Sequence, residues 1–131
     1  MGESKMFLNE GNLHFKDITE QAGVGGATEV GGAVTPKWTT GASVVDINND
    51  GMLDLYVGQL GEYQSIRGRN QLFVCQSIDN GVPVYEDEAI YYGLDLTGFS
   101  TQAVFFDYDL DGDLDMFQMN HSLHQNGTFG E

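Results

Sequence analysis

Two short acidic segments of the chain have the residue types and the spacing of a cation-binding loop. Loop 1 runs from Asp46 to Asp54, and loop 2 runs from Asp107 to Asp115, 61 residues further along. In each loop an oxygen-bearing side chain occupies positions 1, 3, 5 and 9, and glycine occupies position 6. Glycine permits the sharp turn that lets alternate side chains point inward around a hard cation. The expected side-chain ligands are Asp46, Asn48, Asp50 and Asp54 in loop 1 and Asp107, Asp109, Asp111 and Asp115 in loop 2.

The expected ion is Ca²⁺, with one site in each loop. The backbone carbonyl at position 7, from Met52 or Asp113, can add a neutral ligand. Ca²⁺ accepts about six to eight oxygens in flexible geometry, whereas Mg²⁺ needs a stricter octahedron and keeps more water. An EF-hand is disfavoured, because position 12 is Val57 or Gln118 rather than glutamate and strands are expected on both sides. Asn-Asp-Gly and Asp-Gly also form turns without a ligand, but two loops at matched spacing favour a metal site.

The loops belong to a longer internal repeat. Residues 41–57 align without gaps with residues 102–118, and residues 15–24 resemble residues 85–94. The segment Met6-Phe7-Leu8 also resembles Gln71-Leu72-Phe73, and the glycine-rich segment 25–40 is an insertion in the first repeat. We therefore divide the chain into repeat 1 (1–60), repeat 2 (61–119) and a tail or start of a next blade (120–131).

Each repeat contains four apolar or β-branched runs that are too short for helices and favour strands. They span 6–9, 13–18, 41–46 and 53–58 in repeat 1, and 71–76, 83–88, 101–106 and 114–119 in repeat 2. A helical turn that ends at glycine is expected at 20–23 and at 89–93. Four strands in roughly 60 residues, repeated, are typical of propeller blades. The predicted fold is all-β, with two four-stranded antiparallel blades that form a fragment of a larger propeller.

The composition excludes several classes of partner. The chain has 131 residues, of which 20 are acidic and 5 basic, and a formal net charge of −15. Nucleic acids and anionic membrane surfaces are disfavoured, because both are themselves negative. No apolar stretch is long enough for membrane insertion, and no signal peptide is apparent. The single cysteine, Cys75, excludes an intrachain disulfide and lies in an apolar run that indicates a buried thiol.

The two repeats resemble the FG-GAP/VCBS family, which forms the blades of integrin-α-like β-propellers. The matching segments are Phe-Lys-Asp-Ile-Thr at 15–19, Ala-Gly-Val at 22–24, Gly-Ala at 41–42 leading into loop 1, and Ala-Val-Phe-Phe at 103–106 leading into loop 2. The resemblance covers residues 6–119 and implies a calcium-stabilised propeller, usually extracellular or on the cell surface. It implies a role in adhesion or in binding a protein or carbohydrate ligand. The tail resembles the continuation into a next blade in secreted FG-GAP proteins that carry an UnbV/ASPIC domain.

The chain departs from the family in length, because two blades cannot close a propeller of about seven. Three explanations stay open: a piece of a longer propeller, an oligomer that completes a ring, or a two-blade stack with exposed edges.

Other residues offer weaker candidate sites. His121 and His124 could form a transition-metal pair, although no third ligand stands in pattern with them. Arg67 and Arg69 could bind a carboxylate, although a solvated connection between blades is the simpler interpretation. Aromatic residues that could line a binding surface are Trp38, Tyr63, Tyr91 and Tyr92.

The sequence favours a binding module over an enzyme. No serine lies in a nucleophile-elbow pattern, and the carboxylates are spaced for a shared cation rather than for acid–base work across a sugar ring. Two alternatives remain, namely the propeller part of a secreted polysaccharide-active enzyme and a self-assembling interaction module.

Overall fold

The computed structural model describes residues 4–25, 28–30, 33–35, 37–61, 66 and 68–122. These residues form short strands, all paired antiparallel, and two four-residue helices, so the all-β prediction is confirmed. No helix in these ranges has the length and apolarity that a membrane span requires. The elements are β1 (Phe7–Asn9), β2 (Phe15–Asp17), α1 (Thr19–Ala22), β3 (Thr28–Val30), β4 (Ala33–Thr35), β5 (Thr39–Val45), β6 (Asp54–Gln59), β7 (Gln71–Asp79), β8 (Val82–Asp87), α2 (Ala89–Tyr92), β9 (Ser100–Phe106) and β10 (Asp115–Asn120).

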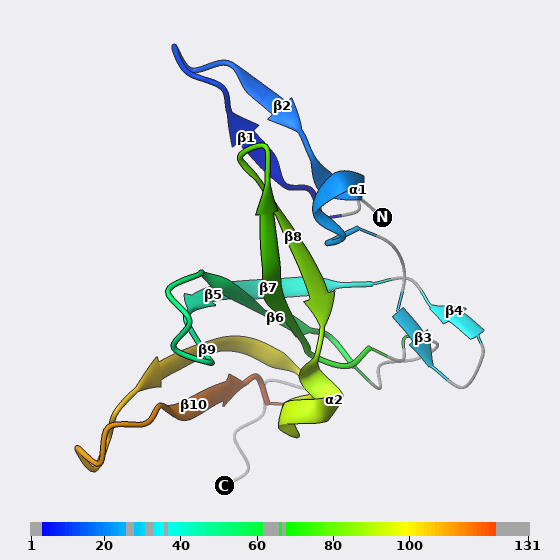
Figure 1. The fold of residues 1–131 in the computed structure, drawn as a ribbon. Helices are drawn as coiled ribbons and strands as arrows, with labels where there is room; N and C mark the ends of the chain where they lie inside the picture. Colours follow the sequence, from blue (N-terminus) through cyan, green and yellow to red (C-terminus); the bar gives the residue numbers. More distant parts are fainter. Residues whose placement is uncertain are drawn as a thin grey trace, which may run out of the picture.

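The centre of the fold is a four-stranded sheet in the order β5-β6-β7-β8 (Figure 1). The strands β1 with β2, β3 with β4, and β9 with β10 form separate two-stranded hairpins. The sheet therefore takes two strands from repeat 1 and two from repeat 2, and the expected grouping of each repeat into its own four-stranded blade is wrong. β6 pairs with the next strand along the chain, in a register that places Leu55 opposite Phe73 and Tyr56 opposite Leu72. Apolar side chains on both strands stabilise this pairing.

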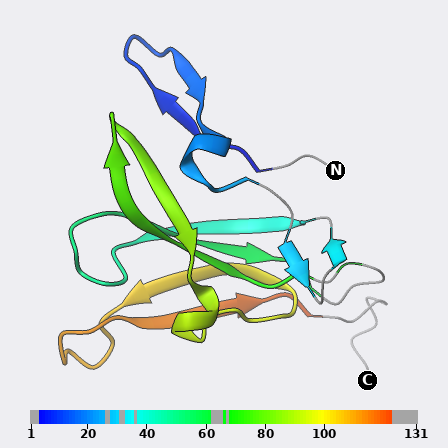
Figure 2. The same cartoon turned by 45° about the vertical axis from the view of Figure 1, so that its right-hand side comes forward.

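Both faces of the four-stranded sheet are covered (Figures 1 and 2). Hairpin β1–β2 with α1 lies on one side of the sheet, and hairpin β9–β10 lies on the other. Successive side chains of a strand point to opposite faces, so the continuous apolar run 72–75 in β7 supplies both cores. The prediction that Cys75 is buried is confirmed. One core comprises Ile18, Ala22, Phe73, Cys75, Val82 and Tyr85. The other comprises Tyr56, Leu72, Val74, Ala89 and Ala103.

A buried polar network joins the sheet to hairpin β9–β10. The Asn70 side chain has no exposed surface, and its Nδ2 donates to Tyr56 Oη and to Ser100 Oγ, each at 2.9 Å. Its Oδ1 accepts the backbone N–H of Gln59 at 2.9 Å. A buried amide without partners is costly, so these bonds fix β6, β9 and the entry to β7 relative to one another.

The structure also corrects the alignment of the first strands. Phe7 pairs with Asp17 as Phe73 pairs with Asp87, so Phe7 corresponds to Phe73 and not to Leu72. A slip of one residue exchanges the two faces of a strand, and a three-residue apolar run does not distinguish the two registers. The inserted segment 25–40 contains hairpin β3–β4, which the sequence did not predict.

Gly41 lies where the sheet and hairpin β9–β10 approach closely. A Cβ at this position would lie 2.3 Å from the Thr101 carbonyl oxygen and 2.6 Å from Gln102 Oε1. Nearby, the Ser43 hydroxyl donates to the Ala103 carbonyl. The hairpin can therefore pack on β5 only while position 41 has no side chain.

Gly41→Ala should lower the free energy of unfolding by about 1–3 kcal/mol, because the added methyl forces two backbones apart. Urea unfolding followed by circular dichroism would measure the loss. Val44→Ala is the matched control, since this side chain on the same strand is 62% exposed and its removal should cost less than about 0.5 kcal/mol. Equal losses in the two variants would contradict the close packing of β5 on β9.

Candidate metal centre

Loops 1 and 2 share four internal hydrogen bonds. In both, the carboxylate at position 1 accepts the backbone N–H groups of positions 5 and 6, at 3.0 and 2.9 Å for Asp46 and at 3.2 and 3.0 Å for Asp107. The carboxylate at position 9 accepts the N–H of position 2, at 2.8 Å in each loop. The carboxylate at position 5 accepts the N–H of position 7, at 2.7 Å in loop 1 and 3.1 Å in loop 2. The repeat therefore extends from residue types to individual bonds.

The backbone turns at the same positions in both loops. The glycine at position 6 has a φ of 85° at Gly51 and 97° at Gly112, a region that glycine enters without strain. Position 4 is also left-handed, with a φ of 56° at Asn49 and 62° at Leu110. Asparagine tolerates this region, but leucine rarely adopts it. Leu110 is therefore held there by the surrounding bonds of the loop.

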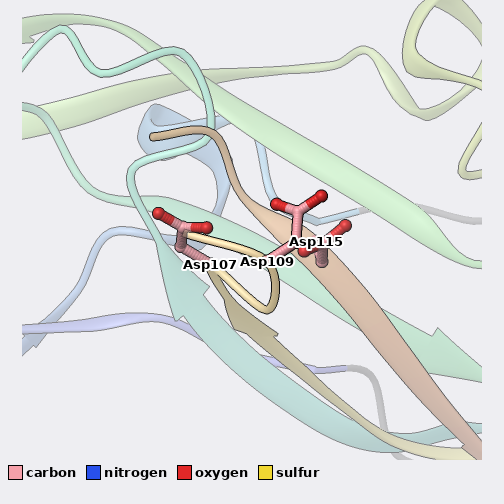
Figure 3. Close-up of side chains that lie close together, drawn as sticks. All are labelled: Asp107, Asp109 and Asp115. Carbon is pink, nitrogen blue, oxygen red and sulfur yellow. The ribbon is translucent and has the colours of Figure 1, made fainter. Parts of the chain in front are cut away.

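Loop 2 brings three carboxylates together (Figure 3). One oxygen from each of Asp107, Asp109 and Asp115 lies within 4.8 Å of the others. Oxygens bound to a shared Ca²⁺ at about 2.3–2.6 Å lie at most about 5 Å apart, so the side chains already fit the size of the ion. Asp107 and Asp109 come from the loop, and Asp115 is the first residue of β10. The cluster therefore joins the two ends of loop 2.

Loop 1 carries less charge than loop 2. Asn48 replaces an aspartate at position 3, and its Oδ1 accepts the N–H of Asp50 at 3.2 Å while its Nδ2 donates to Asp50 Oδ2 at 2.8 Å. Loop 1 thus offers three carboxylates and one amide oxygen, whereas loop 2 offers four carboxylates. The side chain of Met52 packs against the core, so this residue can contribute to the loop only through its backbone. Ligand charge tunes calcium affinity, and we expect loop 2 to attract the ion more strongly.

The carboxylates at position 9 have different surroundings. Asp54 has no exposed surface, and its second oxygen accepts the backbone N–H of Cys75 from the neighbouring strand β7 at 2.8 Å. Asp115 is exposed, because β10 has only β9 beside it among the described strands. The sequence did not indicate the Cys75 donor, since a backbone N–H carries no residue signature and its position depends on strand pairing.

Hydrogen bonds in loop 2 move two pKa values in opposite directions. The backbone N–H of Asp113 donates to the Asp111 carboxylate, and chiefly for this reason the pKa of Asp111 lies below its ordinary value of 3.8. The Asp113 side chain forms a hydrogen bond to Asp111 that favours its protonated form, and this bond and repulsion from Asp111 raise the pKa of Asp113 above 3.8. Repulsion among crowded carboxylates is the condition that a bound cation relieves.

The remaining candidates do not form a second site within the described residues. Arg69 pairs with Asp87 at 3.0 Å, and His121 Nδ1 lies 2.8 Å from the Ser122 carbonyl oxygen. Trp38 and Tyr91 are exposed, and Tyr91 makes an edge contact with Tyr92 at 5.2 Å between ring centres. The candidates that lie outside the described residues are Tyr63, Arg67 and His124.

Neither a protein-family model nor a curated protein matches the chain. The assignment of the acidic loops therefore depends on their own geometry and on the internal repeat.

In calcium-free solution the carboxyl of Asp113 should titrate above pH 3.8 and that of Asp111 below it, as measured by carbon-detected NMR of the aspartate side chains. The raised pKa of Asp113 gives a stabilising contribution that is complete below pH 3.8 and is lost as the pH rises through the pKa of the folded state.

Asp113→Asn is the control for this titration. It removes the upper transition but keeps the backbone N–H, so the pKa of Asp111 should stay below 3.8. An Asp113 midpoint at or below 3.8 in the native chain would show that the two side chains do not share a proton.

Proposed function

We propose that the chain is a calcium-binding module of the β-propeller type, resembling FG-GAP/VCBS repeats, with one Ca²⁺ in each acidic loop. The observation that supports this most is the recurrence of the same hydrogen bonds around the same loop positions, 61 residues apart. A loop that only reverses the chain does not require an oxygen-bearing side chain at each of positions 1, 3, 5 and 9. The clustered carboxylates of loop 2 also need a counter-charge.

The role of the ion is structural. Bound Ca²⁺ supplies positive charge that neutralises carboxylates which otherwise repel one another. The carboxylate at position 1 follows the end of β5 or β9, and the one at position 9 begins β6 or β10. Ligands from both ends of the loop would thus hold each strand pair together. The residues that would hold the ions are Asp46, Asn48, Asp50, Asp54, Asp107, Asp109, Asp111 and Asp115, with the carbonyls of Met52 and Asp113.

The packing of the strands is consistent with a propeller. The four-stranded antiparallel sheet has a hairpin against each face (Figure 2), as a blade lies between its two neighbours. The cores on the two faces are similar, since each combines aliphatic and aromatic side chains of the sheet with residues from one short helix and one hairpin. A sandwich would instead bury one face of each sheet and leave the other in water.

We place the module outside the cell or on its surface. Calcium is abundant there, and extracellular sites of this kind have dissociation constants on the order of 10⁻⁴–10⁻³ M. A protein or a carbohydrate is the ligand class we propose, and the exposed rings of Trp38 and Tyr91 are available for stacking on it. An enzymatic role gains no support, because Arg69, a cation expected near such a site, is already paired with Asp87.

Calcium should raise the melting temperature of the full chain above that in EDTA, as measured by differential scanning calorimetry. At ten times the dissociation constant each site contributes about 1.4 kcal/mol, so two sites shift the midpoint on the order of 10 °C for a chain of this size. Mg²⁺ at the same concentration should shift it less, because it resists dehydration. An unchanged midpoint on chelation would remove the structural role of the metal.

Asp46→Asn and Asp107→Asn should each abolish one of two binding events in isothermal titration calorimetry with calcium chloride. The loss in affinity at the altered loop should be at least about tenfold, since even residues that only support a metal ligand contribute 10- to 100-fold. Asp79→Asn is the control, because this exposed aspartate lies at the end of β7 outside both loops. Two intact binding events in both loop variants would contradict the assignment.

A further inference from the structure

Residues 4–24 and residues 69–94 form the same structural unit, a hairpin followed by a helical turn. After the second strand, the backbone N–H of Ile18 donates to the Met6 carbonyl at 2.9 Å, and that of Glu88 donates to the Leu72 carbonyl at 2.8 Å. A left-handed glycine ends each turn, with a φ of 75° at position 23 and 69° at position 93. The two hairpins also share one register, in which Phe7 corresponds to Phe73.

The equivalent aspartates of the two units, Asp17 and Asp87, each pair with a basic side chain, although the two basic residues are not equivalent. In the shared register Lys5 corresponds to Gln71, whose Nε2 also donates to Asp87, at 2.9 Å. Asp17 binds Lys5 at 2.8 Å, and Asp87 binds Arg69 at 3.0 Å. The same aspartates also accept a backbone N–H from the start of the following helix, at 3.1 and 3.2 Å. These shared bonds of the aspartate support the similarity of residues 4–24 to residues 69–94.

Hairpin β9–β10 likewise reproduces the strand pair β5–β6. Asp115 lies opposite Phe106 as Asp54 lies opposite Val45, so Asp115 corresponds to Asp54 and Phe117 to Tyr56. Apart from hairpin β3–β4, the part of the chain that the structure describes contains one complete sheet, made of a β5–β6 pair and a β7–β8 hairpin, and one further half of each kind. The two further halves lie on opposite sides of that sheet (Figure 1).

In the central sheet the edge of β6 pairs with the edge of β7. The equivalent strands of the two further halves are β10 and β1, and their equivalent edges are open. Among the described strands, β10 pairs only with β9, and β1 pairs only with β2. The Met6 carbonyl and the Glu10 N–H form hydrogen bonds with the β2 side of the hairpin. Backbone groups of successive residues point to opposite sides of a strand, so the N–H groups of Phe7 and Asn9 face the open edge. Phe73 is 4% exposed in the sheet, whereas its counterpart Phe7 is 52% exposed. Phe117 is 58% exposed, although Tyr56 is 1% exposed.

We infer that the open edge of β10 binds the β1–β2 hairpin of a second molecule of this chain, which forms a four-stranded sheet in the order β9-β10-β1-β2. By correspondence with β6 and β7, Met116 lies opposite Phe7 of the second molecule and Phe117 opposite its Met6. The backbone N–H of its Asn9 donates to Asp115, as that of Cys75 donates to Asp54. The partner molecule thereby completes the position 9 carboxylate of loop 2.

A second molecule suits this edge in shape, and the segment that would touch loop 2 carries no net charge although the whole chain carries −15. The edge of β10 is equivalent to the edge of β6, which already pairs with a similar hairpin, β7–β8, within the chain. The segment 5–17 is formally neutral, with two cations and two carboxylates, so it adds no net negative charge beside the five aspartates of loop 2. Each molecule has one edge of each kind, so the contact is head-to-tail and either closes a ring or continues.

Light scattering after size exclusion, on the full chain over a range of concentrations, tests the association. The mass should rise above the 14.4 kDa of one chain as the concentration increases. Phe117→Lys should return the mass to that of one chain while the circular dichroism spectrum stays native, because the side chain is exposed in the single molecule. Ile90→Lys, on an exposed position of α2, is the control and should associate like the native chain. A native chain that stays monomeric at every concentration would overturn the proposal.

Disulfide trapping tests the register. The chains Met6→Cys and Phe117→Cys, mixed and mildly oxidised, should form a disulfide between the two molecules, because this pair corresponds to the closely spaced pair Leu72 and Tyr56. Ile78→Cys, which is exposed near the end of β7, should not be trapped with either chain. Association without this disulfide would mean that another surface joins the molecules and would overturn the proposed edge.

This inference is separable from calcium binding when both measurements are made with calcium and with EDTA. Calcium-dependent melting of a monomeric chain would contradict only the assembly. A trapped assembly whose melting does not respond to calcium would contradict only the proposed function.

Discussion

The fold depends on one buried carboxylate, that of Asp54. It has no exposed surface, and it accepts one N–H from Ile47 in loop 1 and one from Cys75 in β7, both at 2.8 Å. A buried carboxylate without partners is unfavourable by several kcal/mol, so loop 1 must close and β7 must pair with β6 for the charge to be tolerated. This single residue couples the acidic loop to the joining of the two repeats, and the cores on both faces can form only on the sheet that results.

The sequence predicted the local structure well and the assembly of strands poorly. The strands around both loops, the helical turns that end at Gly23 and Gly93, and the burial of Cys75 follow from residue type and spacing. The grouping of strands does not, because each half of a repeat has an apolar pattern that fits either neighbour. The choice of neighbouring strand depends on hydrogen bonds of the backbone, such as that from the Cys75 N–H to Asp54. It also depends on close contacts between strands, such as that of Gly41 with β9.

The loops combine a shared framework with unequal surroundings. In each, the position 1 carboxylate is fixed by two N–H groups of the turn, and its remaining lone pairs stay available for a cation. In loop 2 the oxygens of Asp107, Asp109 and Asp115 already lie close together, which would reduce the ordering that binding of a cation requires. Asn48 and the buried Asp54 make loop 1 less charged and more enclosed, whereas loop 2 keeps exposed aspartates and a shifted proton equilibrium between Asp111 and Asp113.

The offset between the sequence repeat and the sheet has an evolutionary consequence. A boundary between repeats falls in the middle of the four-stranded sheet, between β6 and β7. A gene duplication that adds one whole repeat therefore donates two strands to the sheet before it and two to the sheet after it. Apart from an insertion such as hairpin β3–β4, each strand of the added repeat then has a place in one of these sheets, and the new junction is of the kind that β6 and β7 already make. The length of such a chain can therefore change by whole repeats, because each new junction would use the same type of strand pairing as β6 with β7.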